Sequence, residues 1–322
     1  MSRKNARTWE TLVNWAPIVL FTYDRLKHAR ETIEALAAND GARESDLVIY
    51  SDGPKTVDRE EAVRAVREYV RSVSGFKSVT VVERAQNMGL SNSVIAGVSD
   101  VLTRSASVIV MEDDLVTTRN FLAFVNAALS TYGQREDVFS VTGYNYPIAM
   151  PKRYREDAYL SHRSTSWGWG TWRDRWSQVD WSVGDYAEFA VDSRERERFS
   201  RGGDDLPLIL EMQMAGKIDS WDVCFCYSHY KHDALCLHPV VSKVQNIGFD
   251  GSGVHCTESD DYTVELDRGD RPFQLRPDLT VDRSVLRAFE RRYRPSRQRL
   301  RTRLGLGRVK RRLGRLARLA AT

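Results

Sequence analysis

The stretch SVIVMEDD, residues 107–114, decides the fold, because four apolar residues are followed at once by three carboxylates. A short apolar run rich in β-branched residues is typical of a strand that is buried on both faces, as in a parallel sheet. Three adjacent carboxylates repel one another, so a cation or partner groups must offset their charge. The stretch therefore predicts a buried strand over residues 107–111 that ends in a charged site.

Units of one strand and one helix also precede this stretch. Apolar residues that recur every three or four positions mark the helices, and short apolar runs bounded by turn residues mark the strands. The expected strands cover residues 17–23, 47–50 and 78–82, and the expected helices cover residues 25–38, 57–73, 90–102 and 120–132. Such alternation forms right-handed crossover units around a parallel sheet. We therefore expect an α/β fold with a mostly parallel central sheet flanked by helices.

In sheets of this kind, ligands bind beyond the carboxyl ends of the strands. The residues that follow three of the expected strands are polar, at positions 24–25, 51–53 and 112–114. The first strand is not followed by GxGxxG, and GxxxxGK[ST] does not occur in the sequence. A Rossmann dinucleotide site and a P-loop are therefore excluded.

The carboxylate triplet has two interpretations. Carboxylate oxygens at a strand end suit Mg²⁺ or Mn²⁺, which bind one or two carboxylates plus substrate phosphates. Alternatively, Asp114 or Thr117 caps the helix that is expected to begin near residue 118. The pattern alone leaves both interpretations open.

Several motifs occur in an order that resembles a known family. They are PIVLFTYDR at residues 17–25, SDG at 51–53, NMGL at 87–90 and VIVMEDDL at 108–115, and the resemblance continues to about residue 256 through Gly168-Trp169-Gly170, Trp221-Asp222 and the stretch 238–255. The sequence resembles the GT-A glycosyltransferases. More narrowly, it is similar to the N-acetylglucosaminyltransferase I group, in which EDD serves as the DxD motif. The resemblance implies a GT-A-like fold and metal-dependent, inverting transfer of a sugar from a nucleotide-sugar donor, UDP-linked, to a glycan or lipid-linked acceptor in surface polysaccharide or lipopolysaccharide synthesis.

The resemblance also implies roles for residues of the site. Asp114 would ligate the metal ion, Mn²⁺ or Mg²⁺. The donor would be bound by Arg25 at its phosphates or sugar, by Asp52 at its base, and by Glu112 and Asp113 at its sugar and ribose.

The general base implied by the resemblance is Asp222. A single carboxylate within reach can deprotonate the attacking hydroxyl, and direct attack from the opposite face inverts the anomeric carbon. The family tends to show a further acidic residue where this sequence has Val223. Asp219 is therefore the second candidate for the base.

Residues 166–181 contain five of the eight tryptophans. Aromatic faces stack on sugar rings, so we expect residues 167–170 to form a loop near the donor sugar, with Trp169 in contact with it. The alternative is an ordinary helical core face, because Trp169, Trp172 and Trp176 are spaced at i, i+3 and i+7.

A glycine-rich loop, residues 248–253, is expected to fold over the bound donor and exclude water. His255 follows this loop and would ligate the metal or contact a phosphate; the alternative is a partly buried histidine. The cysteines Cys224, Cys226, Cys236 and Cys256 fit no standard zinc spacing, and we expect small buried thiols in a reduced compartment.

The charge of the chain is divided unevenly. Residues 291–322 hold 13 of the 48 basic residues and no acidic residue, which leaves residues 1–290 with a net charge of −9. We therefore expect a catalytic domain over residues 1–290, with a nucleotide-sugar half at about 16–135 and an acceptor half at about 136–290, and a separate tail.

The tail has the pattern of a basic amphipathic helix, with Leu306, Val309, Leu313 and Leu316 on one face. Such a helix binds anionic membrane surfaces. The alternatives are a disordered basic tail or a non-specific RNA contact, and no specific nucleic acid is expected. No stretch reaches 18 apolar residues, so we expect a cytoplasmic protein that is peripheral on the inner face of the cell membrane.

Two other functions would fit an α/β sheet with acidic strand ends. A sugar nucleotidyltransferase would be expected to carry a glycine-rich, basic loop after the first strand, where this sequence has TYDR. A membrane-associated glycan-binding protein would need no functional metal site.

Overall fold

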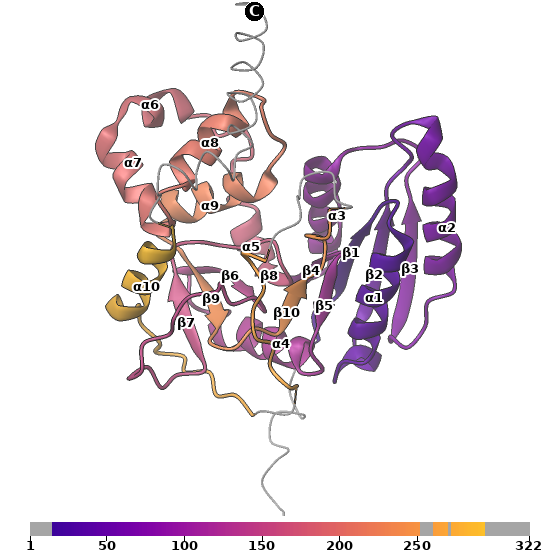
Figure 1. The fold of residues 1–322 in the computed structure, drawn as a ribbon, viewed down its shortest axis with the longest axis horizontal. Coiled ribbons are helices and arrows are strands. Elements are labelled where there is room, and N and C mark those ends of the chain that lie inside the picture. Colours follow the sequence, from indigo (N-terminus) through magenta and orange to yellow (C-terminus); the bar gives the residue numbers. More distant parts are fainter. Residues whose placement is uncertain (1–14, 252–259, 270–271, 294–322) are drawn as a thin grey trace, which may run out of the picture.

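The computed structural model describes residues 15–251, 260–269 and 272–293, which are built around an eight-stranded sheet (Figure 1). Across the sheet the strands are β3 (Ser78–Glu83), β2 (Asp46–Ser51), β1 (Ile18–Thr22), β4 (Ser107–Glu112), β8 (Trp169–Trp172), β6 (Val138–Thr142), β9 (Leu235–Pro239) and β7 (Ala158–Ser161). β8 is antiparallel to both of its neighbours and β7 is antiparallel to β9, whereas all other pairs are parallel. The prediction of a mostly parallel central sheet is confirmed.

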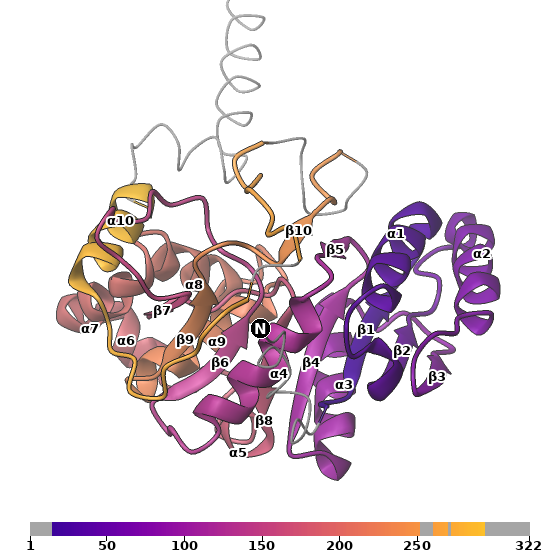
Figure 2. The same cartoon turned by 90° about the horizontal axis from the view of Figure 1, so that it is seen from below.

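Helices alternate with the first four strands, as the apolar spacing predicts. They are α1 (Leu26–Ala37), α2 (Glu60–Arg71), α3 (Leu90–Arg104) and α4 (Phe121–Tyr132). Short 3₁₀ turns lie at Ala42–Glu44, Val57–Arg59 and Ser200–Gly202. α1 and α2 lie on one side of β1 and β2, and α3 lies on the other side (Figure 2).

The two faces of the sheet are buried in separate cores. On β1, Ile18 and Leu20 pack with α1, α2 and α4, whereas Val19 and Phe21 pack with α3 and with an aromatic cluster. Successive residues of a strand point to opposite faces, so a strand that is apolar at every position must be covered on both sides. Both faces of β1 are therefore covered, and the polar residues that follow the strands lie at the edge of the sheet.

Part of the tryptophan-rich stretch, Trp169–Trp172, forms a strand, where we expected a loop over residues 167–170 or a helical core face. Trp169 and Gly170 belong to β8, which pairs with β4 and β6, and the helix α5 (Arg173–Trp176) begins only afterwards. A Cβ on Gly170 would lie 2.9 Å from the backbone oxygen of Val108, so glycine permits the close pairing of the two strands. Pairing with strands that are distant in the sequence therefore overrides the helical spacing of the tryptophans.

A helical region follows β8 and lies at the upper left of Figure 1. It consists of α6 (Tyr186–Val191), α7 (Ser193–Phe199), α8 (Leu206–Met214) and α9 (Trp221–Lys231). The helices enclose a small core of their own.

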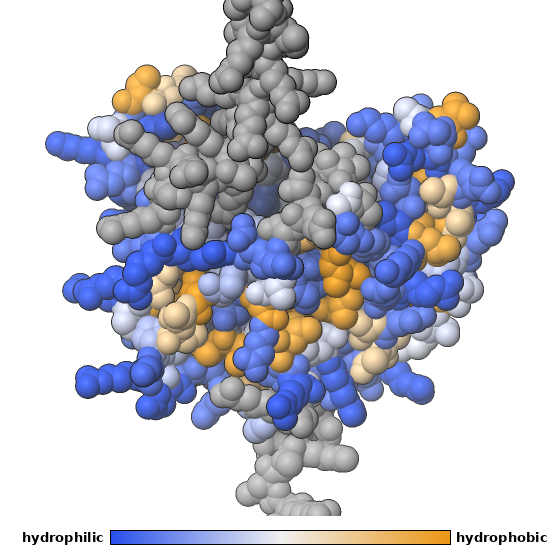
Figure 3. All heavy atoms as spheres, in the orientation of Figure 1, coloured by the Kyte–Doolittle hydropathy of each residue, from blue (hydrophilic) through white to orange (hydrophobic). Residues whose placement is uncertain are grey.

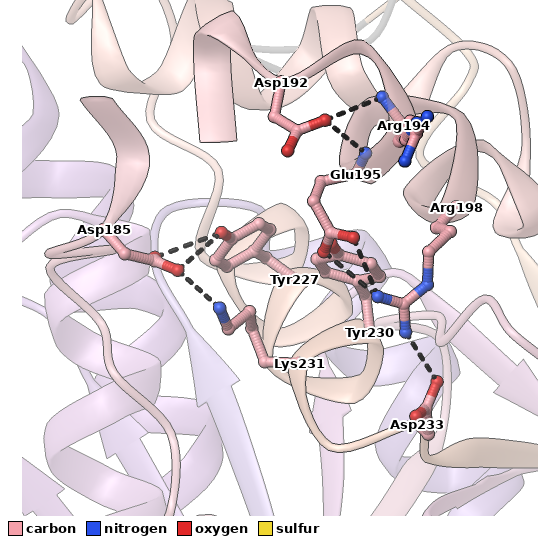
Figure 4. Close-up of polar contacts among 9 residues, drawn as sticks. All are labelled: Asp185, Asp192, Arg194, Glu195, Arg198, Tyr227, Tyr230, Lys231 and Asp233. Carbon is pink, nitrogen blue, oxygen red and sulfur yellow. Dashed lines mark hydrogen bonds and ion pairs between the residues drawn. The ribbon is translucent and has the colours of Figure 1, made fainter. Parts of the chain in front are cut away.

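Polar contacts of α9 fix its position in this region (Figure 4). Tyr227 donates to Asp185 at 3.0 Å, and the Nζ atom of Lys231 lies 2.6 Å from the same carboxylate. Tyr230 donates to Glu195, which also pairs with Arg198. The C-terminal half of α9 is thus held from two sides.

Two shorter elements complete the described structure. β5 (Leu115–Thr117) pairs antiparallel with β10 (Val244–Asn246), which brings the stretch after β9 back to the end of β4. α10 (Arg283–Tyr293) packs Val285, Phe289 and Tyr293 against the core. The expected boundary at residue 290 therefore falls inside a helix, and the rest of the tail, residues 294–322, lies outside the described residues, as does His255.

The surface and the cysteines add little functional signal. Hydrophilic and apolar residues are interspersed on the face shown in Figure 3. In the described ranges the exposed large apolar side chains are Val57, Met88 and Val191, on different elements. Cys224, Cys226 and Cys236 are buried free thiols, as expected. No helix of the described part is long and apolar enough to cross a membrane.

Candidate active site

The carboxylate triplet forms the turn between β4 and β5, at the carboxyl end of β4. Asp113 and Asp114 are buried, and Glu112 is partly exposed. The residue before α4 is Asn120, and it makes no side-chain capping bond. The alternative that Asp114 or Thr117 caps this helix is therefore wrong, because both lie in or before β5.

Thr32 of α1 fixes the shape of the turn. Its hydroxyl donates to the backbone oxygen of Asp113 at 2.8 Å and accepts from the backbone nitrogen of Leu115 at 3.1 Å. A buried turn must satisfy its backbone polar groups, and one hydroxyl satisfies two of them here. The triplet is thus held on a rigid support.

Arg25 lies against two carboxylates of the triplet. Its Nη2 atom is 2.5 Å from Asp113 Oδ1 and 2.8 Å from Asp114 Oδ2, and the backbone nitrogen of Tyr23 donates to Asp113 Oδ2 at 3.2 Å. Burial disfavours the charged guanidinium, but Asp113 and Asp114 outweigh this effect and raise the pKa of Arg25. Burial, reinforced by Asp114 and opposed by Arg25, raises the pKa of Asp113 to about 6. Arg25, Asp113 and Asp114 thus form one charged unit.

Glu112 and Asp222 interact electrostatically. Burial of the Glu112 carboxylate, together with the negative charges of Asp114, Asp113 and Asp222, raises the pKa of Glu112 well above its usual value. Within the described part of the chain, the side chain of Glu112 has neither an ion pair nor a hydrogen bond. Asp222 lies in the first turn of α9 and accepts a short hydrogen bond from Ser220. The structure therefore brings the predicted base close to the predicted donor site.

The N-terminal end of α9 is supported by aromatic packing. Trp221 is 4% exposed and lies 5.1 Å, ring to ring, from Trp169 of β8, with Phe225 of α9 packed against both. This packing holds the start of α9, and with it Asp222, against the sheet.

Residues 246–248 cover the triplet, and the sequence motifs did not single out Asn246. Its side chain donates to Asp114 Oδ1 at 3.4 Å and accepts from the backbone nitrogen of Gly248 at 2.7 Å, while the backbone nitrogen of Ile247 donates to the Asp114 carbonyl at 2.8 Å. A Cβ on Gly248 would lie 2.2 Å from Asp114 Oδ2, so only glycine fits there. The start of the glycine-rich loop thus lies directly on the site.

Asp52 lies at the end of β2, two strands from the triplet. Its buried carboxylate accepts from the backbone nitrogens of Gly53, Met88 and Gly89 at 3.0–3.2 Å. These bonds fix the NMGL segment at the start of α3. The contact of Asp52 with the donor base stays a prediction.

The remaining predicted residues are placed as follows. Asp219 is exposed, and its Oδ2 atom lies 3.7 Å from where a Cβ on Gly89 would stand. Trp169 is 1% exposed, so the ring that we expected beside the donor sugar is enclosed in the core. Trp167, which is partly exposed, contacts Phe249 and Tyr262 with ring centroids 5.6 and 5.4 Å apart.

The residues present fit a divalent cation whose coordination shell is completed by oxygen atoms of a bound substrate. Among the described residues no group of three His, Cys, Asp or Glu side chains forms a complete metal site. Asp113 and Asp114 nevertheless converge on one cationic nitrogen of Arg25, so two carboxylates point to a single cation position. Mg²⁺ and Mn²⁺ accept such incomplete protein sites when substrate phosphates supply further oxygens.

Comparison with known proteins yields similarities to solved structures only. No family model and no curated protein matches the sequence. The mannosyltransferase PcManGT from Pyrobaculum calidifontis, solved in complex with GDP-Man and Mn²⁺, is 14% identical with a TM-score of 0.39, over 68% of this chain and 70% of that chain.

Two structures of S. aureus TarS are also similar. One is 9% identical with a TM-score of 0.41, over 71% of this chain and 36% of TarS, and the other, TarS 1–349, is 11% identical with a TM-score of 0.39, over 71% and 59%. We base no functional argument on similarities of this size.

Proposed function

We propose that this chain is a metal-dependent, inverting glycosyltransferase that moves a sugar from a nucleotide-sugar donor to a glycan or lipid-linked acceptor. One observation carries the proposal: two buried carboxylates converge on a cation position at the end of β4, and Asp222 at the start of α9 interacts electrostatically with the neighbouring Glu112. The resemblance of the motifs to GT-A enzymes supports the same conclusion.

The triplet and Arg25 would handle the donor. Asp114, with Asp113 beside it, would hold Mn²⁺ or Mg²⁺. A bound divalent ion neutralises the negative charge that develops on the leaving diphosphate. The Glu112 side chain has no ion pair or hydrogen bond among the described residues, so its carboxylate is available to accept hydrogen bonds from the hydroxyls of the donor.

Asp222 would act as the general base. The acceptor hydroxyl attacks the anomeric carbon from the face opposite the diphosphate, and its proton passes to the Asp222 carboxylate as the new bond forms. The helix N-terminus stabilises the negative charge of this carboxylate, and Ser220 orients it. Asp219 remains the second candidate.

The donor base and the location of the enzyme belong to the same proposal. As the resemblance implies, Asp52 would accept a hydrogen bond from the ring N–H of a uracil-type base, and the donor would then be UDP-linked. The basic segment beyond Tyr293 would hold the enzyme on an anionic membrane, where lipid-linked acceptors are found.

A donor panel tests the proposal. Purified protein is incubated with Mn²⁺ and UDP- or GDP-linked sugars, and the release of nucleoside diphosphate is measured. At least one donor is expected to be hydrolysed or transferred in a reaction that EDTA abolishes. The proposal fails if every donor is inert and no nucleoside diphosphate binds with Mn²⁺.

The base is tested with Asp222→Asn and the matched variant Asp219→Asn. Loss of one general base lowers turnover by about 10²- to 10⁴-fold. Asp222→Asn should show this loss while it retains Mn²⁺-dependent nucleotide binding, and Asp219→Asn should remain active. The reverse pattern would assign the base to Asp219.

A further inference from the structure

Arg25 supplies the positive charge inside the triplet. Its guanidinium lies 2.5 Å from Asp113 and 2.8 Å from Asp114, and no other basic side chain of the described residues pairs with either carboxylate. Two buried, adjacent carboxylates without a cation would be costly. Arg25 therefore compensates the charge of the triplet in the absence of metal.

The guanidinium and a divalent ion compete for the same oxygens. Mg²⁺ binds carboxylate oxygens at about 2.0–2.1 Å. Asp114 Oδ2, which such an ion would need, is the oxygen that Arg25 contacts. Two cations that share one oxygen repel each other strongly in a partly buried site.

The backbone of residue 248 lies directly against the ion pair of Arg25 and Asp114. The position of a Cβ on Gly248 is 2.2 Å from Asp114 Oδ2 and 3.1 Å from Arg25 Nη1. The ion pair thus lies between the turn after β4 and residue 248. A cation that binds Asp114 Oδ2 on this side meets the guanidinium that already contacts this oxygen.

We propose that Arg25 is a built-in counter-cation, which a divalent ion displaces efficiently only when it arrives with a nucleoside diphosphate. This inference rests on the proposed function and identifies the metal–diphosphate complex, rather than the free ion, as the species that the site takes up. The displaced guanidinium pairs with the diphosphate, because arginine binds phosphate oxygens through two parallel hydrogen bonds. Arg25 is thereby the residue that couples the binding of the two ligands.

The proposal predicts two effects of opposite sign for Arg25→Gln. Removal of the competing charge strengthens the binding of free Mn²⁺, on the order of tenfold. Removal of the phosphate partner weakens the binding of UDP in the presence of Mn²⁺, also on the order of tenfold. A residue that only contacts the donor would produce the second effect alone.

Isothermal titration calorimetry measures both affinities, first with Mn²⁺ alone and then with UDP at saturating Mn²⁺. Arg59→Gln is the matched control, because Arg59 pairs with Asp24 at 3.1 Å and does not contact the triplet. It removes the same charge from the neighbourhood and should change neither affinity by more than about twofold. Melting temperatures with and without Mn²⁺ provide a second measure: Mn²⁺ should raise the melting temperature of Arg25→Gln more than that of the wild type.

An unchanged or weaker affinity of Arg25→Gln for free Mn²⁺ would overturn the proposal. Tighter Mn²⁺ binding with unchanged UDP affinity would overturn the transfer of the guanidinium to the diphosphate. If the wild type binds no nucleotide at all, the proposed function fails, but the titration with Mn²⁺ alone still decides whether Arg25 competes. If Arg25→Gln does not fold, Arg25→Lys is used instead. Lysine keeps the positive charge, so this variant should retain the wild-type Mn²⁺ affinity and bind UDP less tightly. Tighter binding of Mn²⁺ by Arg25→Lys would contradict the proposal.

Discussion

At the scale of single residues, the sequence places the reactive groups better than it predicts their partners. The three carboxylates could be located because an apolar run ends at residue 111 and a parallel sheet exposes its strand ends. Arg25 could be located because it follows the first strand. Asn246 and Gly248 could not be assigned to Asp114, because their contacts depend on β10 pairing with β5 from more than 120 residues away.

Glu112 gives a pH-dependent prediction at this scale. Because its folded pKa is raised, the folded state holds a proton that the unfolded state releases near pH 4.3, so stability falls as pH rises from there toward the folded pKa. The glutamine side chain of the variant Glu112→Gln cannot ionise, so the variant does not lose stability in this way as pH rises. In EDTA, the unfolding free energy of the variant should therefore increase relative to that of the wild type as pH rises above the unfolded pKa of glutamate.

Urea unfolding at several pH values measures this difference. Glu61→Gln is the control, because Glu61 is 88% exposed and lies on α2, away from the triplet. A difference between Glu112→Gln and the wild type that stays constant with pH would contradict the raised pKa.

At the scale of elements, the local spacing of apolar residues is sufficient to predict a strand and its helix where the two are neighbours in the sequence. β1 to β4 and α1 to α4 occur close to the expected ranges, because each buries its apolar residues against an adjacent element. β8 was missed because it pairs between β4 and β6, out of sequence order. The spacing of its tryptophans is compatible with a helix as well as with a strand. Pairing with β4 and β6, which are distant in the sequence, decides for the strand.

α9 allows a prediction about how an element is anchored. His229 is 0% exposed, its Nδ1 atom lies 2.8 Å from the Phe225 carbonyl, and its Nε2 atom lies 2.8 Å from Ser140 Oγ of β6. A neutral ring donates through Nδ1 and accepts through Nε2, and burial lowers the pKa of His229 to about 4. The unfolded histidine binds a proton near pH 6.5, so this stability is complete above that pH and is lost as pH falls toward 4.

His229→Gln removes the titration. The difference in unfolding free energy between wild type and variant should shrink by about 3 kcal/mol from pH 7 to pH 4. Glu112 and Asp113 affect the pH dependence of stability with the opposite sign. Their effects are the same in the wild type and the variant, so they cancel in the difference between the two unfolding free energies. Chemical denaturation at each pH measures this difference in unfolding free energy. A difference that stays the same from pH 7 to pH 4 would show that His229 is not held neutral.

At the scale of the whole molecule, the sequence divides into an acidic part, residues 1–290, and a basic part, residues 291–322. Composition alone revealed the division, since 13 basic residues and no acidic ones lie after residue 290. The boundary itself could not be read from charge, because α10 continues to Tyr293 and buries that side chain. A count of basic residues along the sequence does not show at which residue the packed domain ends.

Deletion of residues 294–322 tests the tail without disturbing α10. Full-length protein should sediment with vesicles that contain phosphatidylserine and stay in solution with neutral phosphatidylcholine vesicles, because the attraction is electrostatic. The truncated protein should lose this binding and keep the wild-type melting temperature. Equal sedimentation of both proteins with anionic vesicles would refute a membrane role for the tail.

The central claim is that the triplet holds a divalent ion together with a nucleoside diphosphate. It is tested most directly by calorimetric titration of UDP and GDP into the wild type and Asp114→Asn, with and without Mn²⁺, with Asp24→Asn as the control outside the triplet. The account predicts Mn²⁺-dependent binding of at least one nucleotide to the wild type and to Asp24→Asn, and at least a tenfold loss in Asp114→Asn. Binding that is independent of Mn²⁺, or equal affinity in Asp114→Asn and the wild type, would contradict it.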